Sequence, residues 1–345
     1  MTETVEGQQI QPQKTLKTSR EAPSPPMSCM RVAPALGAWL AICLAACGDG
    51  STSPLNDPRG IMLVVSGTGS ASEIYAMRPD GSGRQRLTQN AILDGDPDWS
   101  PDGRQIAFIS AVDSEPGAPA RRRDVYLMSA DGSGKHRLFQ GAPGAGAAHP
   151  RWSPDGSRIS FDSFDAALGG FQPYVMNSDG SNVKLVRAMP GENFGLEWSP
   201  DGTRFLFLSN RAPRFLWTMY VMPTDGSSDQ QLSGNVACTS NLGRAAQWSP
   251  DGSSIAFSCA TNLGSWISTM QADGTALTIV TIPATEAFDP VWSPSGAQIA
   301  FAGNPGSVGG NPVSQVFVIN AAGGAVSQIT NGTVRNVVTA WRSWH

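Results

Sequence analysis

The feature that most constrains the fold of this chain is an internal repeat. The phrase Trp-Ser-Pro-Asp-Gly recurs at steps of 44 to 53 residues. Copies begin at Trp99, Trp152, Trp198 and Trp248, followed by a variant with serine for aspartate at Trp292 and a truncated copy at Trp341. Such a repeat takes precedence over other fold signals, because each unit is one supersecondary element that buries its apolar face only against its neighbours.

A second phrase, Met-x-x-Asp-Gly-Ser/Thr, alternates with the first. Its copies begin at Met77, Met128, Met176, Met222 and Met270, with a degenerate sixth copy at Ile319. Together the two phrases define six units over residues 61–345, of about 47 residues each. This length is typical of one four-stranded blade of a β-propeller.

Each unit is predicted to contain four short strands. In the second unit these are residues 97–99, 105–109, 124–128 and 136–139. Proline and glycine in Ser-Pro-Asp-Gly favour a tight reversal between the first two strands. Asp-Gly between the last two strands is a strong hairpin signal. No sustained apolar period of 3.6 residues follows Cys47, so the chain is predicted to be all-β.

The two ends of the repeat predict how the ring closes. The first unit begins with a second strand, residues 61–65, and no Trp-Ser-Pro-Asp-Gly precedes it. Residues 338–342 form a first strand that has no second strand after it. The carboxyl-terminal strand is therefore expected to complete blade one and remove an open sheet edge. The prediction is one six-bladed β-propeller of four-stranded blades.

The repeated Trp-Ser-Pro-Asp-Gly and Met-x-x-Asp-Gly-Ser phrases resemble the propeller repeats of the TolB family. The resemblance covers residues 61–345, and both phrases recur in register. TolB proteins carry an amino-terminal α/β domain between their signal and their propeller, and they are soluble in the periplasm. Here about 13 residues separate Cys47 from Ile61. The resemblance thus implies the propeller fold, and membership of a Tol assembly does not follow from it.

The amino terminus is predicted to be an export segment. An apolar run, residues 32–46, follows Arg31 and ends in Leu-Ala-Ala before Cys47. A basic residue, a short apolar stretch and small residues at the cleavage site are typical of a secretory signal. The apolar run is also short for a membrane span. Leu-Ala-Ala-Cys resembles a bacterial lipobox, which makes Cys47 the lipidated anchor. The alternative is an ordinary cleaved signal in which Cys47 is incidental.

The chain is accordingly divided into three parts. Residues 1–46 are the export segment, of which residues 1–29 are either a mis-set start or a disordered extension. Residues 47–60, rich in small polar residues, form a flexible tether. Residues 61–345 form the propeller. The expected location is the bacterial cell envelope, with the propeller facing the periplasm and only the lipid anchor in a membrane.

Two cysteines, Cys238 and Cys259, remain in the predicted mature body beyond the anchor. An even pair of cysteines in an exported protein indicates a disulfide. The alternative is a pair of unpaired buried thiols.

Charge and motif content narrow the class of function. Basic residues number 24 and acidic residues 28, for a net charge of −4, so no basic excess is present to neutralise a phosphate backbone. Nucleic acid is not expected as a partner. No G-x-S-x-G, H-E-x-x-H, P-loop or dinucleotide-binding glycine motif occurs. We therefore assign no catalytic residue, cofactor or metal ligand.

Topology places the variable loops on one face. The turns between the first two and the last two strands of each unit are uniform and fall on one face, where aspartate is predicted to act as a turn former. The other loops vary in length and chemistry, and binding residues tend to lie on such loops. Arginine and tryptophan are enriched at binding hot spots, and these loops are predicted to hold Arg121, Arg122, Arg123 and Trp217.

A second set of candidates precedes the tryptophan of each unit by three or four residues. These positions are expected at the mouth of the central channel, where mixed charges are suited to a polar ligand or a peptide terminus. They are Asp96, His149, Phe194, Arg244, Asp289 and Val338. The alternative is that Asp-Pro and His-Pro only begin the following strand. The tryptophans themselves are predicted to pack between blades.

The sequence thus favours a non-catalytic, monomeric envelope lipoprotein that binds a protein or peptide through its variable-loop face. The alternative is a carbohydrate-binding or polymer-binding protein, or a lyase. A mouth with basic residues and exposed aromatics favours the glycan hypothesis, and a broad apolar patch with a polar rim favours a protein partner.

Overall fold

The structure is a computed structural model of the 345-residue chain. The residues it describes are 60–68, 71–90, 92–112, 122–141, 146–211, 217–232, 246–261, 264–281, 286–304 and 313–342. The export segment, the tether up to residue 59 and Cys47 lie outside the described residues. Within these ranges, no helix has the length and apolar character needed to cross a membrane.

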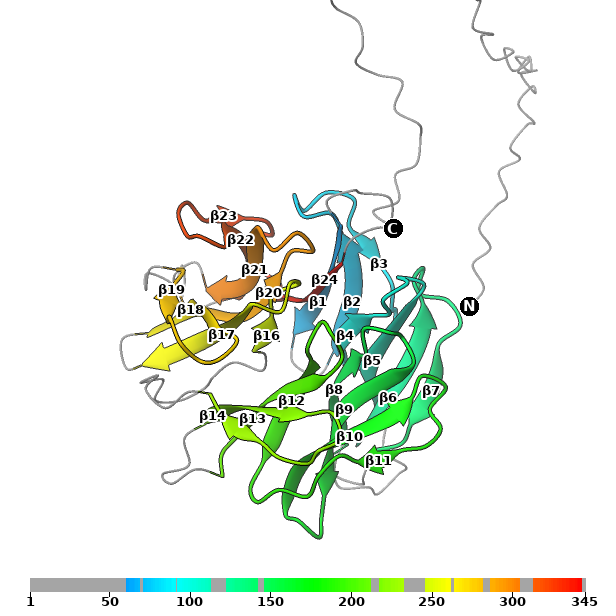
Figure 1. Cartoon of the computed structure of the whole chain (residues 1–345). Coiled ribbons are helices and arrows are strands. Elements are labelled where there is room, and N and C mark those ends of the chain that lie inside the picture. The colour runs from blue at the N-terminus through cyan, green and yellow to red at the C-terminus, as the bar shows by residue number, and fades with distance from the viewer. Residues whose placement is uncertain are drawn as a thin grey trace, which may run out of the picture. The chain divides into compact units, whose positions relative to one another are not determined.

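The described residues form 24 strands in six antiparallel, four-stranded sheets, which are the blades of a β-propeller (Figure 1). Blade 1 contains β24 (Asn336–Arg342), β1 (Ile61–Thr68), β2 (Ala71–Met77) and β3 (Gln85–Arg86). Blade 2 contains β4 (Asp94–Trp99), β5 (Gln105–Val112), β6 (Arg122–Ser129) and β7 (His136–Phe139). Blade 3 contains β8 (Ala147–Trp152), β9 (Arg158–Asp165), β10 (Gly170–Asn177) and β11 (Lys184–Leu185).

The other three blades follow the same order. Blade 4 contains β12 (Asn193–Trp198), β13 (Arg204–Ser209), β14 (Thr218–Pro223) and β15 (Gln230–Gln231). Blade 5 contains β16 (Gln247–Trp248), β17 (Ser254–Thr261), β18 (Gly264–Gln271) and β19 (Thr278–Ile279). Blade 6 contains β20 (Glu286–Trp292), β21 (Gln298–Asn304), β22 (Gln315–Asn320) and β23 (Ser327–Gln328). The predicted six-bladed fold is confirmed.

The Ser-Pro-Asp-Gly turns are held by their own side chains. In the second unit the Ser100 hydroxyl donates to Asp102 at 2.7 Å, and the same carboxylate accepts the Arg104 N–H at 3.0 Å. Gly103 has a φ of 67°, a left-handed conformation that glycine adopts without strain. Equivalent serine and backbone hydrogen bonds lower the pKa of Asp155 and of Asp201 to about 2. These aspartates are turn formers, as predicted.

The tryptophans of the repeat join neighbouring blades. All six are between 4% and 9% exposed. In three places an arginine from the preceding blade lies over the ring: Arg158 over Trp198, Arg204 over Trp248 and Arg342 over Trp99, at 4.6, 4.8 and 4.1 Å from the ring centroid. A guanidinium over an indole face contributes roughly 0.5–2 kcal/mol. The tryptophans are therefore packing residues, as predicted.

The carboxyl-terminal strand closes the ring, as Figure 1 shows for β24 beside β1. It pairs antiparallel with β1 from Ile61 opposite Arg342 to Ser66 opposite Asn336. Its Val338 and Trp341 pack in one cluster with residues of β1 and of blade 6. One strand thus completes blade 1 and covers the side of blade 6.

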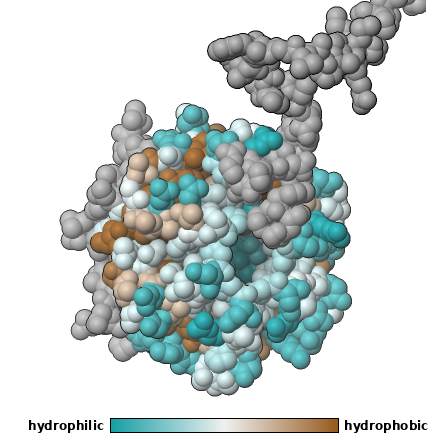
Figure 2. Space-filling model, turned by 45° about the horizontal axis from the view of Figure 1, so that its top comes forward, coloured by the Kyte–Doolittle hydropathy of each residue, from teal (hydrophilic) through white to brown (hydrophobic). Residues whose placement is uncertain are grey.

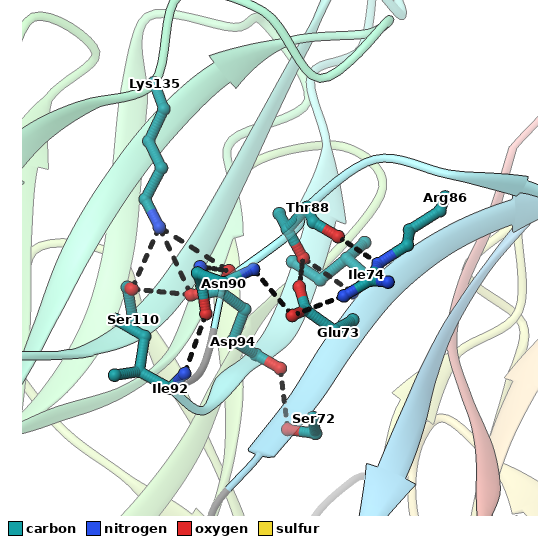
Figure 3. Close-up of polar contacts among 10 residues, drawn as sticks. All are labelled: Ser72, Glu73, Ile74, Arg86, Thr88, Asn90, Ile92, Asp94, Ser110 and Lys135. Atoms are coloured by element: carbon teal, nitrogen blue, oxygen red, sulfur yellow. Dashed lines mark hydrogen bonds and ion pairs between the residues drawn. The ribbon is translucent and has the colours of Figure 1, made fainter. Parts of the chain in front are cut away.

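A buried polar network joins blade 1 to blade 2 (Figure 3). Glu73 on β2 accepts hydrogen bonds from Arg86 at 2.8 Å and from the Thr88 hydroxyl at 2.6 Å. Asn90, in the connection between the blades, donates its backbone N–H to Glu73 at 2.8 Å and its side-chain amide to Asp94 at 2.7 Å. Asn90 therefore links a buried carboxylate of one blade to a buried carboxylate of the next.

The strands are longer than the sequence predicts, and this corrects two loop assignments. Arg122 and Arg123 were expected in a loop but lie in β6, where they pair with Val112 and Ala111 of β5. The prediction ended each strand where its apolar run ended. Backbone hydrogen bonds between two strands of a hairpin do not depend on side-chain polarity, so the pairing extends into polar residues. In the same way, residue 164 of β9 pairs with residue 171 of β10 near the end of their hairpin.

Candidate functional site

A cavity of about 200 Å³ opens among the inner strands of blades 1, 2, 3 and 6. Its lining includes four residues predicted at the channel mouth: Asp96, His149, Asp289 and Val338. Phe194 is not part of the lining, and Arg244 lies outside the described residues. Figure 2 shows one face of the propeller, on which hydrophilic residues surround a hollow near the middle. Candidates from four separate repeats, three of them ionisable, thus converge on one space. We call it the mouth cavity.

Strained backbone positions three of these residues. Asp96, His149 and Asp289 have φ angles of 48°, 48° and 51°, and each is followed by proline. Each lies where the pairing register of the inner strand shifts, which marks a β-bulge. A left-handed conformation in a non-glycine residue costs roughly 1–2 kcal/mol, and bulges re-aim side chains. The bulges fall inside β4, β8 and β20, so the Asp-Pro and His-Pro pairs do not merely begin these strands.

His149 is the most enclosed member of this group. It is 7% exposed, and its Nδ1 lies 2.8 Å from Oδ2 of Asp162 on β9. A carboxylate oxygen only accepts hydrogen bonds, so Nδ1 carries a proton. The Nε2 atom lies 3.9 Å from Oδ2 of Asp96 and has no hydrogen-bond partner. His149 therefore presents an unpartnered ring nitrogen beside a carboxylate from the neighbouring blade.

Below these residues lies a second layer of charges. Arg151, which also lines the mouth cavity, donates from Nε to Glu197 of β12 at 3.1 Å. Asp98 of β4 accepts the backbone N–H of Trp152 at 2.9 Å. Burial raises the pKa of Asp98, and burial, opposed by the charge of Arg151, raises the pKa of Glu197 to about 7. Acidic groups thus outnumber basic groups in this layer.

The sequence analysis missed this layer, although a signal for it exists. Asp98 and Arg151 follow Asp96 and His149 by two residues, and Glu197 occupies the same place before Trp198. All three directly precede a repeat tryptophan, so counting one residue back from Trp99, Trp152 and Trp198 identifies them.

We expect Glu197→Gln to change how stability depends on pH. The pKa of Glu197 is higher in the folded protein than its ordinary value of 4.5, so the folded state holds this proton more tightly than the unfolded state. Stability from this group is present below about pH 4.5 and is lost as pH rises to about 7. Glutamine keeps an acceptor for Arg151 without a charge. The variant should therefore be more stable than the wild type at pH 8, by about 1–2 kcal/mol after allowance for partial exposure.

Urea unfolding of both proteins at pH 4.5, 6, 7 and 8 measures this difference. The two proteins should agree at pH 4.5 and diverge as pH rises. A variant that is less stable than the wild type at pH 8 would show that the ion pair with Arg151 outweighs the cost of burying the charge.

Two arginines lie at the outer edge of the mouth cavity. Arg123 is the second residue of β6, and Arg335 directly precedes β24, so both are at strand ends on the variable-loop face. The neighbouring Arg122 points elsewhere, because its guanidinium donates to both carboxylate oxygens of Asp124 at 2.8 and 3.1 Å. Of the three predicted arginines, only Arg123 is placed at the cavity, and Arg121 lies outside the described residues.

A row of aromatic rings extends from His149 over blades 3 and 4. The edge of the His149 ring faces Phe194 at 6.2 Å between centroids. Phe194 contacts Phe171 at 4.9 Å and Trp217 at 5.2 Å, and Phe171 contacts Phe164 at 5.8 Å. All four rings of this aromatic row, Phe164, Phe171, Phe194 and Trp217, are half-buried. Trp217 thus lies outside the mouth cavity but is connected to it through Phe194.

The remaining predicted site residues are the cysteines. Cys259 on β17 is 6% exposed and disulfide-bonded. Cys238 lies outside the described residues, so its pairing with Cys259 stays a prediction. Across the described ranges, no group of three or more His, Cys, Asp or Glu side chains is arranged to hold a metal ion.

Comparisons with known proteins agree with the repeat and the fold. No protein-family model matches the chain. An uncharacterized protein of Agrobacterium fabrum is 36% identical over 108 residues, which are 30% of this chain and 36% of that protein. The Tol-Pal system protein TolB of Gluconobacter oxydans is 34% identical over 103 residues, which are 30% of this chain and 22% of that protein. The chain therefore spans well under half the length of these curated relatives.

A solved structure extends the similarity to nearly the whole propeller. The crystal structure of TolB from Acinetobacter baumannii superimposes with a TM-score of 0.66 at 20% sequence identity, covering 83% of this chain and 67% of that one. At this identity the match concerns the fold. Taken with the repeated phrases, the six blades and the partial sequence matches, it shows that the propeller of this chain is similar in fold to that of TolB.

Proposed function

We propose that this protein is a non-catalytic envelope lipoprotein, anchored through Cys47, whose propeller binds a protein or peptide through its variable-loop face. The observation that carries the proposal is the mouth cavity. Three charged or polar residues from three blades converge there on strained backbone, and such strain clusters at functional sites. Inner strands paired on a rigid ring hold these groups in place before a partner arrives, which reduces the ordering cost of binding.

The aromatic row supports a protein or peptide partner. Phenylalanine and tryptophan rings, like the arginines that line the mouth cavity, are side chains enriched at protein interfaces. The row is continuous with the mouth cavity through Phe194 and His149. A partner segment that enters the cavity therefore has an apolar surface beside it. The export signal and the TolB-type fold both favour a periplasmic location for this partner.

A second candidate function is the binding of a carbohydrate polymer. The aromatic row favours it, because sugar rings also pack on aromatic faces, and Arg123 and Arg335 would suit an acidic polymer. Asp96 and Asp289 within the same cavity oppose a polyanion by charge repulsion. The protein or peptide partner is therefore the primary proposal.

A crosslinking experiment in cells tests the proposal. The full-length protein is compared with Arg123→Ala/Trp217→Ala, and with the control Arg104→Ala/Lys184→Ala, whose exposed residues follow turns on the opposite face. Arg122 is left intact because it pairs with the buried Asp124. We expect the wild type and the control to capture the same periplasmic protein from isolated membranes. The test variant should capture at least tenfold less of this protein than the wild type does.

Two outcomes would contradict the proposal. Equal capture by all three proteins would place the interface away from the variable-loop face. Capture of no specific protein, together with retention of the wild type on an acidic polysaccharide column, would favour the carbohydrate hypothesis instead.

A further inference from the structure

A groove opens between blades 5 and 6 on the face that carries the uniform turns. Its volume is about 580 Å³, within the range of roughly 300–1,000 Å³ usual for ligand pockets. Residues 249–251 and 294–296, from the Trp-Ser-Pro turns of the two blades, line it together with Thr269 and Trp292. The mouth cavity shares none of these residues. We call this space the turn-face groove.

An arginine fills the corresponding place in two other pairs of neighbouring blades. Arg158 is the first residue of β9, and its guanidinium lies 4.6 Å from the ring centroid of Trp198 in blade 4. Arg204 is the first residue of β13, and its guanidinium lies 4.8 Å from the ring centroid of Trp248 in blade 5. The first residue of the second strand therefore reaches the tryptophan of the next blade.

Blade 5 has a serine at this position, because β17 begins with Ser254. Its side chain is too short to cover the next tryptophan, and among the described residues no cation lies over the Trp292 ring. Trp292 is 8% exposed, against 4% and 5% for Trp198 and Trp248. The indole N–H of Trp292 donates to the Gln247 carbonyl at 3.3 Å, so the ring rather than the N–H is left for a ligand.

An aspartate accompanies each of these arginines. In the two filled pairs, the aspartate of the Ser-Pro-Asp-Gly turn interacts electrostatically with the arginine. Asp251 is the corresponding residue of blade 5, and it lines the groove. It accepts hydrogen bonds from the Ser249 hydroxyl at 2.6 Å and from the Ser253 N–H at 3.0 Å, which lower its pKa and keep it ionised at neutral pH. No lysine, arginine or histidine of the described residues pairs with it.

Blades 5 and 6 contain no basic residue that could balance this charge. Residues 245–334 include four acidic residues and no lysine, arginine or histidine, although the whole chain has 24 lysines and arginines. The four acidic residues are Asp251, Asp273, Glu286 and Asp289. A region with charge of one sign attracts partners of the opposite sign. This side of the propeller therefore favours a positively charged partner.

The lining of the groove is suited to a guanidinium in particular. A guanidinium stacks on the face of an indole and donates its N–H groups in a planar fork to a carboxylate. Trp292 and Asp251 supply the ring and the carboxylate, and Ser254 and Ser295 add hydroxyl groups. A lysine ammonium is a compact, strongly hydrated point charge, and it fits such a planar site less well.

We propose that the turn-face groove binds an arginine side chain of a polypeptide partner, which lies over Trp292 and pairs with Asp251. The bound arginine takes the position that Arg158 and Arg204 hold between the preceding blades. This inference goes beyond the proposed function, because it concerns the opposite face of the propeller and does not depend on the mouth cavity.

The variant Ser254→Arg tests whether the groove accepts a guanidinium. Its own arginine should lie over Trp292 and raise the Tm by about 1–2 °C. The control Ala297→Arg adds the same charge at an exposed position, which Arg104 occupies in blade 2, and its Tm should match that of the wild type. Differential scanning calorimetry measures both. A Tm of Ser254→Arg below that of Ala297→Arg would show that a guanidinium does not fit the groove, and it would overturn the inference.

A random heptapeptide library displayed on phage then probes the empty groove. The baits are the full-length protein in detergent, Ser254→Arg and Ala297→Arg. We expect a set of arginine-containing peptides that bind the wild type and Ala297→Arg alike, and bind Ser254→Arg about tenfold more weakly or worse. The inference is overturned if no peptide is lost with Ser254→Arg, if the lost peptides lack arginine, or if Ala297→Arg loses them equally.

A double-mutant cycle assigns the contact with Asp251. One selected peptide is synthesised with its arginine or with citrulline, which keeps the shape of the side chain without its charge. Citrulline should weaken binding to the wild type about tenfold, and binding to Asp251→Asn by about threefold or less. The control Asp201→Asn changes the same turn position in blade 4, where Arg204 supplies the cation, and should behave like the wild type. Equal losses in the wild type and Asp251→Asn would overturn the pairing.

The two faces of the propeller are separated with Arg123→Ala/Trp217→Ala. This variant should bind the selected peptides as tightly as the wild type, whatever its effect on the partner captured in cells. Loss of the peptides in this variant would place their site on the variable-loop face and overturn the inference without affecting the proposed function.

Discussion

Removal of residues 337–345 is expected to yield a protein that aggregates and lacks a cooperative unfolding transition. These residues include nearly all of β24, which supplies the inner strand of blade 1. Val337, Val338, Ala340 and Trp341 are each at most 9% exposed. Burial of a large apolar side chain contributes about 1.5–3 kcal/mol, so the loss is about equal to the whole stability of an ordinary domain, about 5–15 kcal/mol. The truncation also leaves β1 with an unpaired edge.

Circular dichroism during heating and size-exclusion chromatography measure this effect. The matched control removes only residues 343–345, which follow β24, and it should melt like the full chain. Addition of a synthetic peptide of residues 336–345 to the truncated protein should recover part of the transition. A truncated protein that stays monomeric and melts sharply would show that closure by β24 is dispensable.

Asp94→Ala is the second change for which we expect a large effect. The Asp94 side chain is completely buried and accepts hydrogen bonds from Asn90 at 2.7 Å and from the Ser110 hydroxyl at 2.5 Å (Figure 3). Lys135 lies 3.3 Å from the same carboxylate and is about one third exposed. Removal of one partner of a buried ion pair leaves its donors uncompensated and costs about 3–5 kcal/mol. We expect a loss near the lower end of this range because Lys135 reaches water.

Two control variants separate the charge from the packing. Asp94→Asn keeps the size and one acceptor, so it should lose about half as much stability as alanine. Asp131→Ala, in an exposed turn of the same blade, should stay within about 0.5 kcal/mol of the wild type. Chemical denaturation measures the free energy of unfolding of the three variants. If Asp94→Ala unfolds like the wild type, the contact between blades 1 and 2 depends on apolar packing rather than on this network.

Residues of the candidate site could be predicted from the sequence where they stand at a constant spacing from the repeat tryptophan. Asp96, His149 and Asp289 precede a strand tryptophan by three residues, and all three line the mouth cavity. Arg122 shows where this reasoning stops. Its position at the variable-loop face does not decide its orientation, because the ion pair with Asp124 holds it within blade 2. Competition among partners for a side chain is a property of the folded chain.

The aromatic row is a second feature that the sequence could not assemble. Phe164 and Phe171 meet because β9 and β10 pair in a particular register. Trp217 joins them only because blade 4 packs beside blade 3 and places Phe194 between them. Contacts across blades depend on the rotation of one sheet against the next, and no spacing along the chain encodes that rotation directly.

The sequence by itself determined the number of blades, their strand order and the closure by β24. Repeated turn residues and tryptophans act locally and have the same effect in every unit, so they can be recognised without knowledge of the whole. The tertiary structure alone decided the layered charges of the mouth cavity, the raised pKa of Glu197 and the unpartnered Nε2 of His149. These depend on burial and on distances between residues about 50 positions apart, which exist only once the ring has closed.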